Sequence, residues 1–152
     1  MRLRKGEEIE LSIEKMAYGG QGVARVDGFV LFVQGAIPGD RVMARIVKKK
    51  RSYGEAKVTS IISPSPDRIE PPCPYSDFCG GCQWQHMRYE AQLEYKRRQV
   101  EESLRQIAGL PDVHVKSTIP SEREFAYRNK MEFSFSDRPW LLPHEMAKRN
   151  RE

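Results

Sequence analysis

The chain has 152 residues, of which 31% are charged and 39% hydrophobic, with a formal net charge of +5. This length suits one or two small domains. The longest apolar run, FVLFVQGAI at residues 29–37, is too short to span a bilayer, so we expect no membrane partner. Residues 1–62 hold 12 Lys and Arg against 7 Asp and Glu, whereas residues 63–152 hold 14 of each. A basic module beside a neutral one predicts a polyanionic partner, most often nucleic acid.

Residues 7–62 are predicted to form a small β-barrel. Ile9, Leu11 and Ile13 alternate with polar neighbours, as in a half-buried strand. Turn signals at Asp27-Gly28 and Pro38-Gly39-Asp40 separate further apolar runs, and KKKRSY reads as a basic hairpin tip. Five short strands with a turn after about every ten residues predict a five-stranded, closed, OB-like barrel.

The sequence SPSPDRIEPPCP follows, with five prolines in twelve residues, and we place a domain boundary and linker at residues 63–72. Beyond it, residues 87–108 have a helical period that aligns four apolar side chains on one face: Leu93, Val100, Leu104 and Ile107.

Met131, Phe133 and Phe135 alternate with polar residues and predict a half-buried strand. One helix and one or two strands cannot enclose a core. We therefore expect residues 87–152 to be part of an incomplete α+β central domain, whose helix is covered by another chain or by further sequence.

All three cysteines lie within ten positions, where five residues separate Cys73 from Cys79 and two separate Cys79 from Cys82. No export signal precedes them, so we expect a cytoplasmic protein whose thiols stay reduced and bind metal. Gly80 and Gly81 let the backbone wrap a bound centre closely. His86 could complete a Cys3His zinc site. Alternatively, an iron–sulfur cluster would take a fourth thiolate from beyond residue 152.

Together with the barrel pattern, the cysteine motif gives the chain a sequence that resembles the N-terminal part of bacterial RNA uridine C5-methyltransferases of the RumA/TrmA type. The resemblance runs from about residue 7 to residue 138. It rests on four segments in the family's order: GGQGVAR, DGFVLFVQGAIPGD, CPYSDFCGGCQWQH and YRNKMEFSFS.

The resemblance implies that residues 1–62 are a TRAM domain, an OB-like barrel that holds RNA. Residues 73–86 become an iron–sulfur motif in which Cys73, Cys79 and Cys82 are three of the four ligands of a 4Fe-4S cluster. The S-adenosylmethionine site and the catalytic cysteine and base would lie later in a full-length, monomeric ribosomal-RNA methyltransferase. No catalytic residue is assigned in this chain, which we expect to be inactive alone.

The candidate RNA contacts lie at the basic hairpin tip and at the start of the late strand. Cationic side chains beside an aromatic ring suit phosphate contact and base stacking, and Arg128 matches an arginine that the family uses near its target nucleotide. The candidates are Lys48, Lys49, Lys50, Arg51, Tyr53 and Arg128. Phe29 and Phe32 fall on opposite faces of their strand, and we expect one in the core and the other in an exposed stacking position. A stand-alone RNA-binding module with a Cys3His zinc site remains the alternative function.

Overall fold

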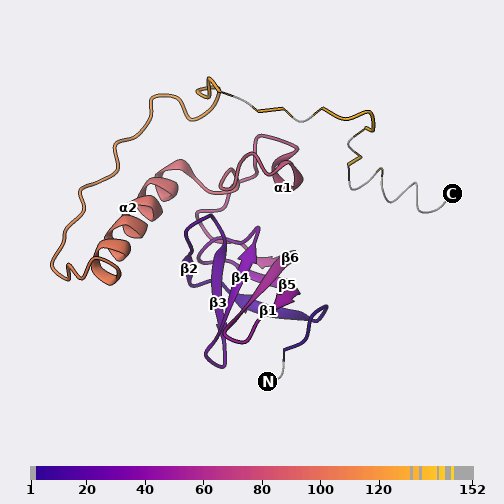
Figure 1. Ribbon diagram of the computed structural model, residues 1–152, viewed down its shortest axis with the longest axis horizontal. Helices are drawn as coiled ribbons and strands as arrows, with labels where there is room; N and C mark the ends of the chain where they lie inside the picture. The colour runs from indigo at the N-terminus through magenta and orange to yellow at the C-terminus, as the bar shows by residue number, and fades with distance from the viewer. Residues whose placement is uncertain (1–2, 131, 134, 140, 143–144, 146–152) are drawn as a thin grey trace. The chain divides into compact units, whose positions relative to one another are not determined.

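The computed structural model describes residues 3–130, 132–133, 135–139, 141–142 and 145. The chain divides into two units, Met1–Pro120 and Ser121–Glu152. The first holds a six-stranded sheet followed by a helix of 18 residues (Figure 1). Among the described helices, none is long and apolar enough to cross a membrane. The predicted class, a mainly β domain followed by one long helix, is confirmed.

The sheet contains the five predicted strands and one very short strand that was not predicted. The strands are β1 (Glu8–Ser12), β2 (Lys15–Met16), β3 (Gly22–Val26), β4 (Phe29–Gln34), β5 (Arg41–Lys49) and β6 (Tyr53–Ser63). Their order is β1-β5-β6-β4-β3-β2. Strands β4 and β6 pair in parallel, and every other pair is antiparallel.

The short strand β2 explains how the sheet closes into a barrel. Strand β1 pairs with β5 at one edge, and its continuation β2 pairs with β3 at the other edge. Between them, Ile13 N–H donates to Asp40 O (2.9 Å) and Glu14 N–H donates to Val23 O (2.8 Å). One segment of chain therefore joins both edges of the sheet, and no long edge is left unpaired there.

Two of the predicted turns have the backbone that their sequences require. Asp27 and Gly28 both have positive φ (50° and 80°), as a type I′ hairpin turn needs between β3 and β4. Gly39 has φ +88°, and Asp40 N–H donates to Ile37 O at 3.1 Å, so Pro38 and Gly39 form the turn before β5. These turns fix the register of the strands on either side.

The barrel interior is filled by the alternating apolar residues of the strands. Ile9, Leu11 and Ile13 are all buried, as their alternation predicted. They belong to one cluster, which consists of Leu3, Ile9, Leu11, Ile13, Ala24, Leu31, Val33, Ala36, Val42, Ala44, Ile46 and Ala56.

The proline-rich segment is fastened to the barrel. The Asp40 carboxylate is buried and accepts from Ile37 N–H (2.8 Å), from Ser65 N–H (2.9 Å) and from the Arg68 guanidinium (2.6 Å at the shortest). Arg68 also donates to Gly35 O at 2.8 Å. The segment is therefore anchored where β5 begins. The predicted boundaries at residues 62, 72 and 86 stay predictions.

The cysteine loop is closed at its base by a short antiparallel contact. Arg68 and Met87 form a β-bridge, and Ile69 N–H donates to His86 O at 3.1 Å. The single-turn helix α1 (Ser76–Cys79) lies within the loop, and Gly80 ends it with φ +74°. The cysteine-containing residues thus form a loop whose two ends are held together by backbone hydrogen bonds.

The long helix α2 (Tyr89–Gln106) packs against the barrel, with boundaries within two residues of the prediction. A second apolar cluster joins Met16 and Ile37 of the barrel to Met87 and Ala91, with Trp84 and Tyr95 packed against it. Further along the helix, Gln99 donates to Ala17 O (3.0 Å) and Lys15 pairs with Glu102 (3.3 Å).

The face of α2 on the barrel differs from the apolar stripe that the sequence predicted. Val100 and Ile107 of that stripe are exposed, while Ala91, on the barrel side, is buried. The segment after the helix returns along it, since Thr118 Oγ1 donates to Leu93 O at 2.9 Å. The barrel and the returning segment together cover part of the helix, which the sequence analysis had expected another chain or further sequence to cover.

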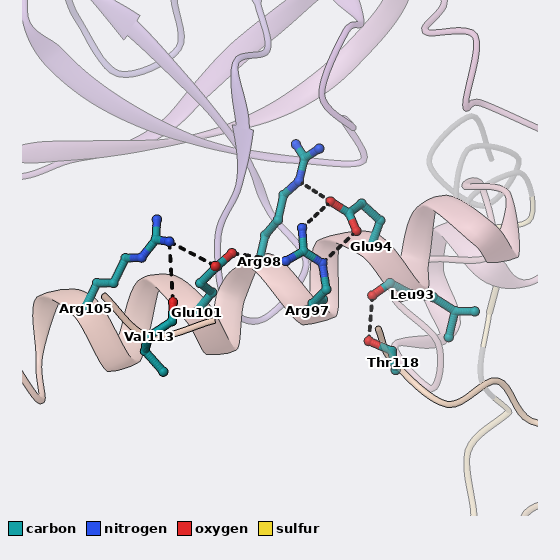
Figure 2. A network of polar contacts seen from close by, with 8 residues as sticks. All are labelled: Leu93, Glu94, Arg97, Arg98, Glu101, Arg105, Val113 and Thr118. Atoms are coloured by element: carbon teal, nitrogen blue, oxygen red, sulfur yellow. Dashed lines mark hydrogen bonds and ion pairs between the residues drawn. The ribbon is translucent and has the colours of Figure 1, made fainter. Parts of the chain in front are cut away.

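Charged side chains lie along α2 in one network (Figure 2). Glu94 accepts from Arg97 (2.8 Å) and Arg98 (2.7 Å), and Glu101 accepts from Arg97 (3.1 Å) and Arg105 (3.0 Å). These are i,i+3 and i,i+4 pairs, which stabilise a helix from its own surface.

The second unit contains the segment where a late strand was predicted. Its described residues 132, 133, 135 and 136 form no strand, and Met131 and Ser134 lie outside the described residues. Phe133 and Phe135 are exposed. A strand needs a partner for its backbone N–H and C=O groups, and no described segment pairs with this one.

Candidate nucleic-acid interface and metal-binding loop

The predicted basic hairpin exists, with its tip closed by Lys50 N–H donating to Tyr53 O at 2.8 Å. Lys50 and Arg51 are exposed at this tip. Lys48 pairs with Glu55 across the hairpin at 2.9 Å, which raises the pKa of Lys48. Lys49 donates to Leu3 O (2.9 Å) and lies 5.9 Å from the centroid of the Phe29 ring.

The four basic residues of the hairpin are therefore not equivalent. Lys48 and Lys49 already have partners in the fold. Within the described part of the chain, Lys50 and Arg51 make no ion pair. They are the cations best placed to meet a phosphate.

Other cations of the barrel are paired with carboxylates on β1 or on the segment between β1 and β2. The pairs are Arg45–Glu8 (2.7 Å), Arg41–Glu10 (3.2 Å) and Arg25–Glu14 (3.9 Å). The charge surplus of the barrel thus falls on side chains outside these pairs, among which Lys50 and Arg51 share one hairpin tip.

An aromatic pair lies beside the basic tip. Tyr53 meets Phe32 edge to face, with ring centroids 5.6 Å apart and an interplanar angle of 78°. Both side chains are half-buried. Phe29, by contrast, packs against the barrel core. The structure therefore assigns Phe29 to the core and Phe32 to the outer aromatic pair, a choice that strand alternation alone left open.

Arg128 lies in the second unit. It is exposed, and its Nε donates to the Lys130 carbonyl oxygen at 3.0 Å. Its predicted role near a target nucleotide stays a prediction, as do the roles of the hairpin residues.

The three cysteines lie in the loop between residues 69 and 86 as free thiols, with Cys73 half-buried and Cys79 and Cys82 exposed. Gly80 has the positive φ that turns the chain after Cys79. A Cβ on Gly81 would lie 3.4 Å from the Cys79 sulfur. The backbone at Gly81 therefore passes within van der Waals distance of this sulfur.

A cavity of about 380 Å³ lies beside this loop, between its two ends and the barrel. Cys73, His86 and Arg68 are among its lining residues. The Nε2 atom of His86 is buried and has no hydrogen-bond partner in the described structure. Burial and the nearby Arg68 guanidinium lower the pKa of His86, which favours the neutral form of its imidazole.

The donor set fits a thiophilic metal, since three thiols and one neutral imidazole are ligands for zinc or iron–sulfur clusters. Within the described ranges, however, no three His, Cys, Asp or Glu side chains converge as a metal site. Cys73, Cys79 and Cys82 stay predicted ligands, and a metal would have to draw their sulfurs together.

Residues 2–59 match the family model of the TRAM domain. The match takes in strands β1 to β5 and most of β6, so it covers the barrel and ends before the cysteine loop.

The chain as a whole is similar to the N-terminal region of bacterial RNA methyltransferases. It is 44% identical over 136 residues to an RNA methyltransferase of Halalkalibacterium halodurans, covering 90% of this chain and 30% of the relative. It is 47% identical over 132 residues to one of Gloeobacter violaceus, covering 86% and 29%. The chain therefore spans less than a third of the length of these curated relatives.

A solved structure is also similar, the tRNA (uracil-54, C5)-methyltransferase of Pyrococcus abyssi in complex with S-adenosyl-L-homocysteine. It is 27% identical, with 66% of this chain and 21% of that chain covered, at a TM-score of 0.42.

Proposed function

We propose that this chain is the RNA-binding and iron–sulfur N-terminal region of an S-adenosylmethionine-dependent uridine C5-methyltransferase that acts on ribosomal RNA. The observation that carries the proposal is a barrel that matches the TRAM model, followed after a short proline-rich segment by the Cys73/Cys79/Cys82 loop, in a chain 44% identical over 136 residues to an RNA methyltransferase. Methyl transfer, the cofactor and the monomeric, cytoplasmic state belong to the proposed whole protein.

The RNA-binding step is supported by the hairpin between β5 and β6. Lys50 and Arg51 supply cations for phosphates, and the Phe32–Tyr53 pair supplies aromatic surface for a base. Single-stranded RNA is favoured over duplex, because its bases can leave the stack and meet a ring.

The RNA-binding step is tested by fluorescence anisotropy with a labelled single-stranded RNA of about 12 nucleotides, titrated at several salt concentrations. The double variant Lys50→Ala/Arg51→Ala should weaken binding. It should also flatten the slope of log affinity against log salt by about 0.7 for each phosphate that the variant no longer neutralises. Arg41→Ala, which removes a cation already paired with Glu10, is the matched control and should leave the slope near that of the wild type.

The metal-binding step is supported by the donor set and by the glycines beside Cys79. When bound, a 4Fe-4S cluster would supply a structural centre that ties the cysteine loop to a fourth thiolate elsewhere in the full protein. Protein reconstituted without air should contain iron and acid-labile sulfide. It should also be brown, because an iron–sulfur cluster absorbs visible light. Cys79→Ser should lower the bound iron, with Cys73→Ser and Cys82→Ser behaving alike.

One observation favours a second candidate, the stand-alone RNA-binding module with a zinc site. His86 lines the same cavity as Cys73, and its buried, unpartnered Nε2 could be the fourth ligand of a Cys3His site. A colourless protein with one equivalent of zinc, lost in His86→Ala, would replace the iron–sulfur proposal with this one.

A further inference from the structure

The turn between β2 and β3 holds an aromatic ring almost entirely in solvent. Tyr18 is 93% exposed, and its ring makes no contact with another ring or charge among the described residues. We propose that Tyr18 is a second base-stacking position for single-stranded RNA. This inference rests on the proposed RNA-binding function and adds to it a residue distant from the basic hairpin.

The turn that carries Tyr18 is closed on itself. Ala17 N–H donates to Gln21 O at 2.8 Å, and Gly20 N–H donates to Ala17 O at 3.1 Å. Gly19 and Gly20 have φ of +90° and +84°, which the sequence provides as a glycine pair. The backbone beneath the ring is therefore fixed by local hydrogen bonds.

The same turn is also contacted by helix α2 and by the cysteine loop. The Gln99 side chain on α2 donates to Ala17 O at 3.0 Å. Gly20 lies directly against Trp84, since a Cβ at Gly20 would meet the indole Nε1 at 2.3 Å. Helix α2 and the cysteine loop thus both brace a turn whose aromatic side chain points to no protein partner.

An exposed ring on a fixed backbone is suited to stacking, because a base that binds it restricts only the side-chain torsions of the tyrosine. Rings that stack on bases, together with cations that meet phosphates, bind single strands without reading their sequence, and the basic hairpin tip supplies the cations.

The strand registers place Tyr18 at the far end of β3 from the basic tip. Tyr53 is opposite Val30 near the start of β4, whereas Gly22, which follows the Tyr18 turn, is opposite Val33 near its end. The two levels are three positions apart along β4, which is about 10 Å. Phe32 is opposite Val23 between them. The proposed path of a single strand runs from the basic tip past the Phe32–Tyr53 pair to Tyr18, and the spacing of the Tyr53 and Gly22 levels along β4 suits a few nucleotides.

The proposal is tested with the whole chain and a single-stranded RNA of about 12 nucleotides that contains 2-aminopurine. Tyr18→Leu, which keeps apolar bulk and loses the aromatic face, should weaken binding by about fivefold or more. It should also relieve part of the 2-aminopurine quenching. Tyr18→Phe keeps the ring and should behave as the wild type. Neither variant should change the salt slope, because the ring neutralises no phosphate.

The outcomes separate this inference from the proposed function. If the wild type binds the RNA and Tyr18→Leu binds it equally well with the same quenching, the Tyr18 proposal is overturned and the RNA-binding function stands. Equal weakening by Tyr18→Phe and Tyr18→Leu would also overturn it, since stacking does not need the hydroxyl. If the wild type fails to bind single-stranded RNA, both proposals fall. Unfolding curves for the variants should match the wild type, because the side chain is exposed.

Discussion

At the scale of single residues, the two glycines of the Tyr18 turn differ in one contact. Both have a positive φ, which costs about 1–2 kcal/mol for a residue with a Cβ. A Cβ at Gly19 would meet nothing within 4 Å, whereas at Gly20 it would overlap the Trp84 ring. Trp84 is packed against the second apolar cluster, so it cannot simply swing aside.

Gly20→Ala should therefore lower the free energy of unfolding by about 1–3 kcal/mol more than Gly19→Ala does. It should also shift the fluorescence emission of Trp84 to longer wavelength, read in a Trp140→Phe background. Urea unfolding of the two variants side by side gives the difference. Equal losses with unchanged emission would mean that the Trp84 ring does not sit on the turn.

At the scale of elements, helix α2 is supported by its own charged network. The hydrogen bonds from Arg97 and Arg98 hold the pKa of Glu94 at about 2, below its ordinary value of 4.5. A carboxylate with a lowered pKa stabilises the fold above its unfolded pKa, and this contribution is lost as the pH falls from about 4.5 toward 2. Because Glu94 is near the surface, its pairs contribute only modestly.

Glu94→Gln should reduce the free energy of unfolding by about 0.5 kcal/mol at neutral pH, and the difference from the wild type should vanish near pH 2. Glu124→Gln is the control, an exposed carboxylate that has no ion pair in the described ranges. Thermal melts from pH 7 to pH 2 provide the measurement. A Glu94→Gln deficit that grows as the pH falls would contradict the assignment.

Local sequence patterns predicted where the strands and turns lie more accurately than they predicted which elements contact one another. The alternation of Ile9, Leu11 and Ile13 and the Asp27-Gly28 signal depend only on neighbours along the chain, and each proved correct. Closure through β2 was missed, because a two-residue strand has no period of its own.

The contact face of α2 was missed for a related reason. The barrel receives Ala91 and the half-polar Tyr95, which carry little weight in a search for apolar stripes. For the candidate site, the hairpin tip was evident from its cluster of lysines. Phe32 could not be chosen over Phe29 without knowing which face of β4 turns inward.

At the scale of the whole first unit, the Asp40–Arg68 pair ties the linker to the barrel across 28 positions of sequence, a pairing that no local pattern announces. Burial raises the pKa of Asp40, but the hydrogen bonds from Arg68 and from the Ile37 and Ser65 N–H groups outweigh it and lower the pKa below 3.8. The pair therefore stabilises the fold above about pH 4, and this contribution is lost in more acidic solution.

Arg68→Met leaves a buried carboxylate without its counter-charge, and should lower the free energy of unfolding by about 3–5 kcal/mol at pH 7. The deficit should narrow toward pH 4, because the isolated Asp40 can then take up a proton. Asp40→Asn/Arg68→Met should recover part of the loss, since no charge remains buried. Arg41→Met, which breaks the exposed pair with Glu10, should cost less than about 1 kcal/mol. Urea unfolding followed by circular dichroism measures the free energy of unfolding of the wild type and these variants. If Arg68→Met loses no more of this free energy than Arg41→Met does, the linker is not anchored through this pair.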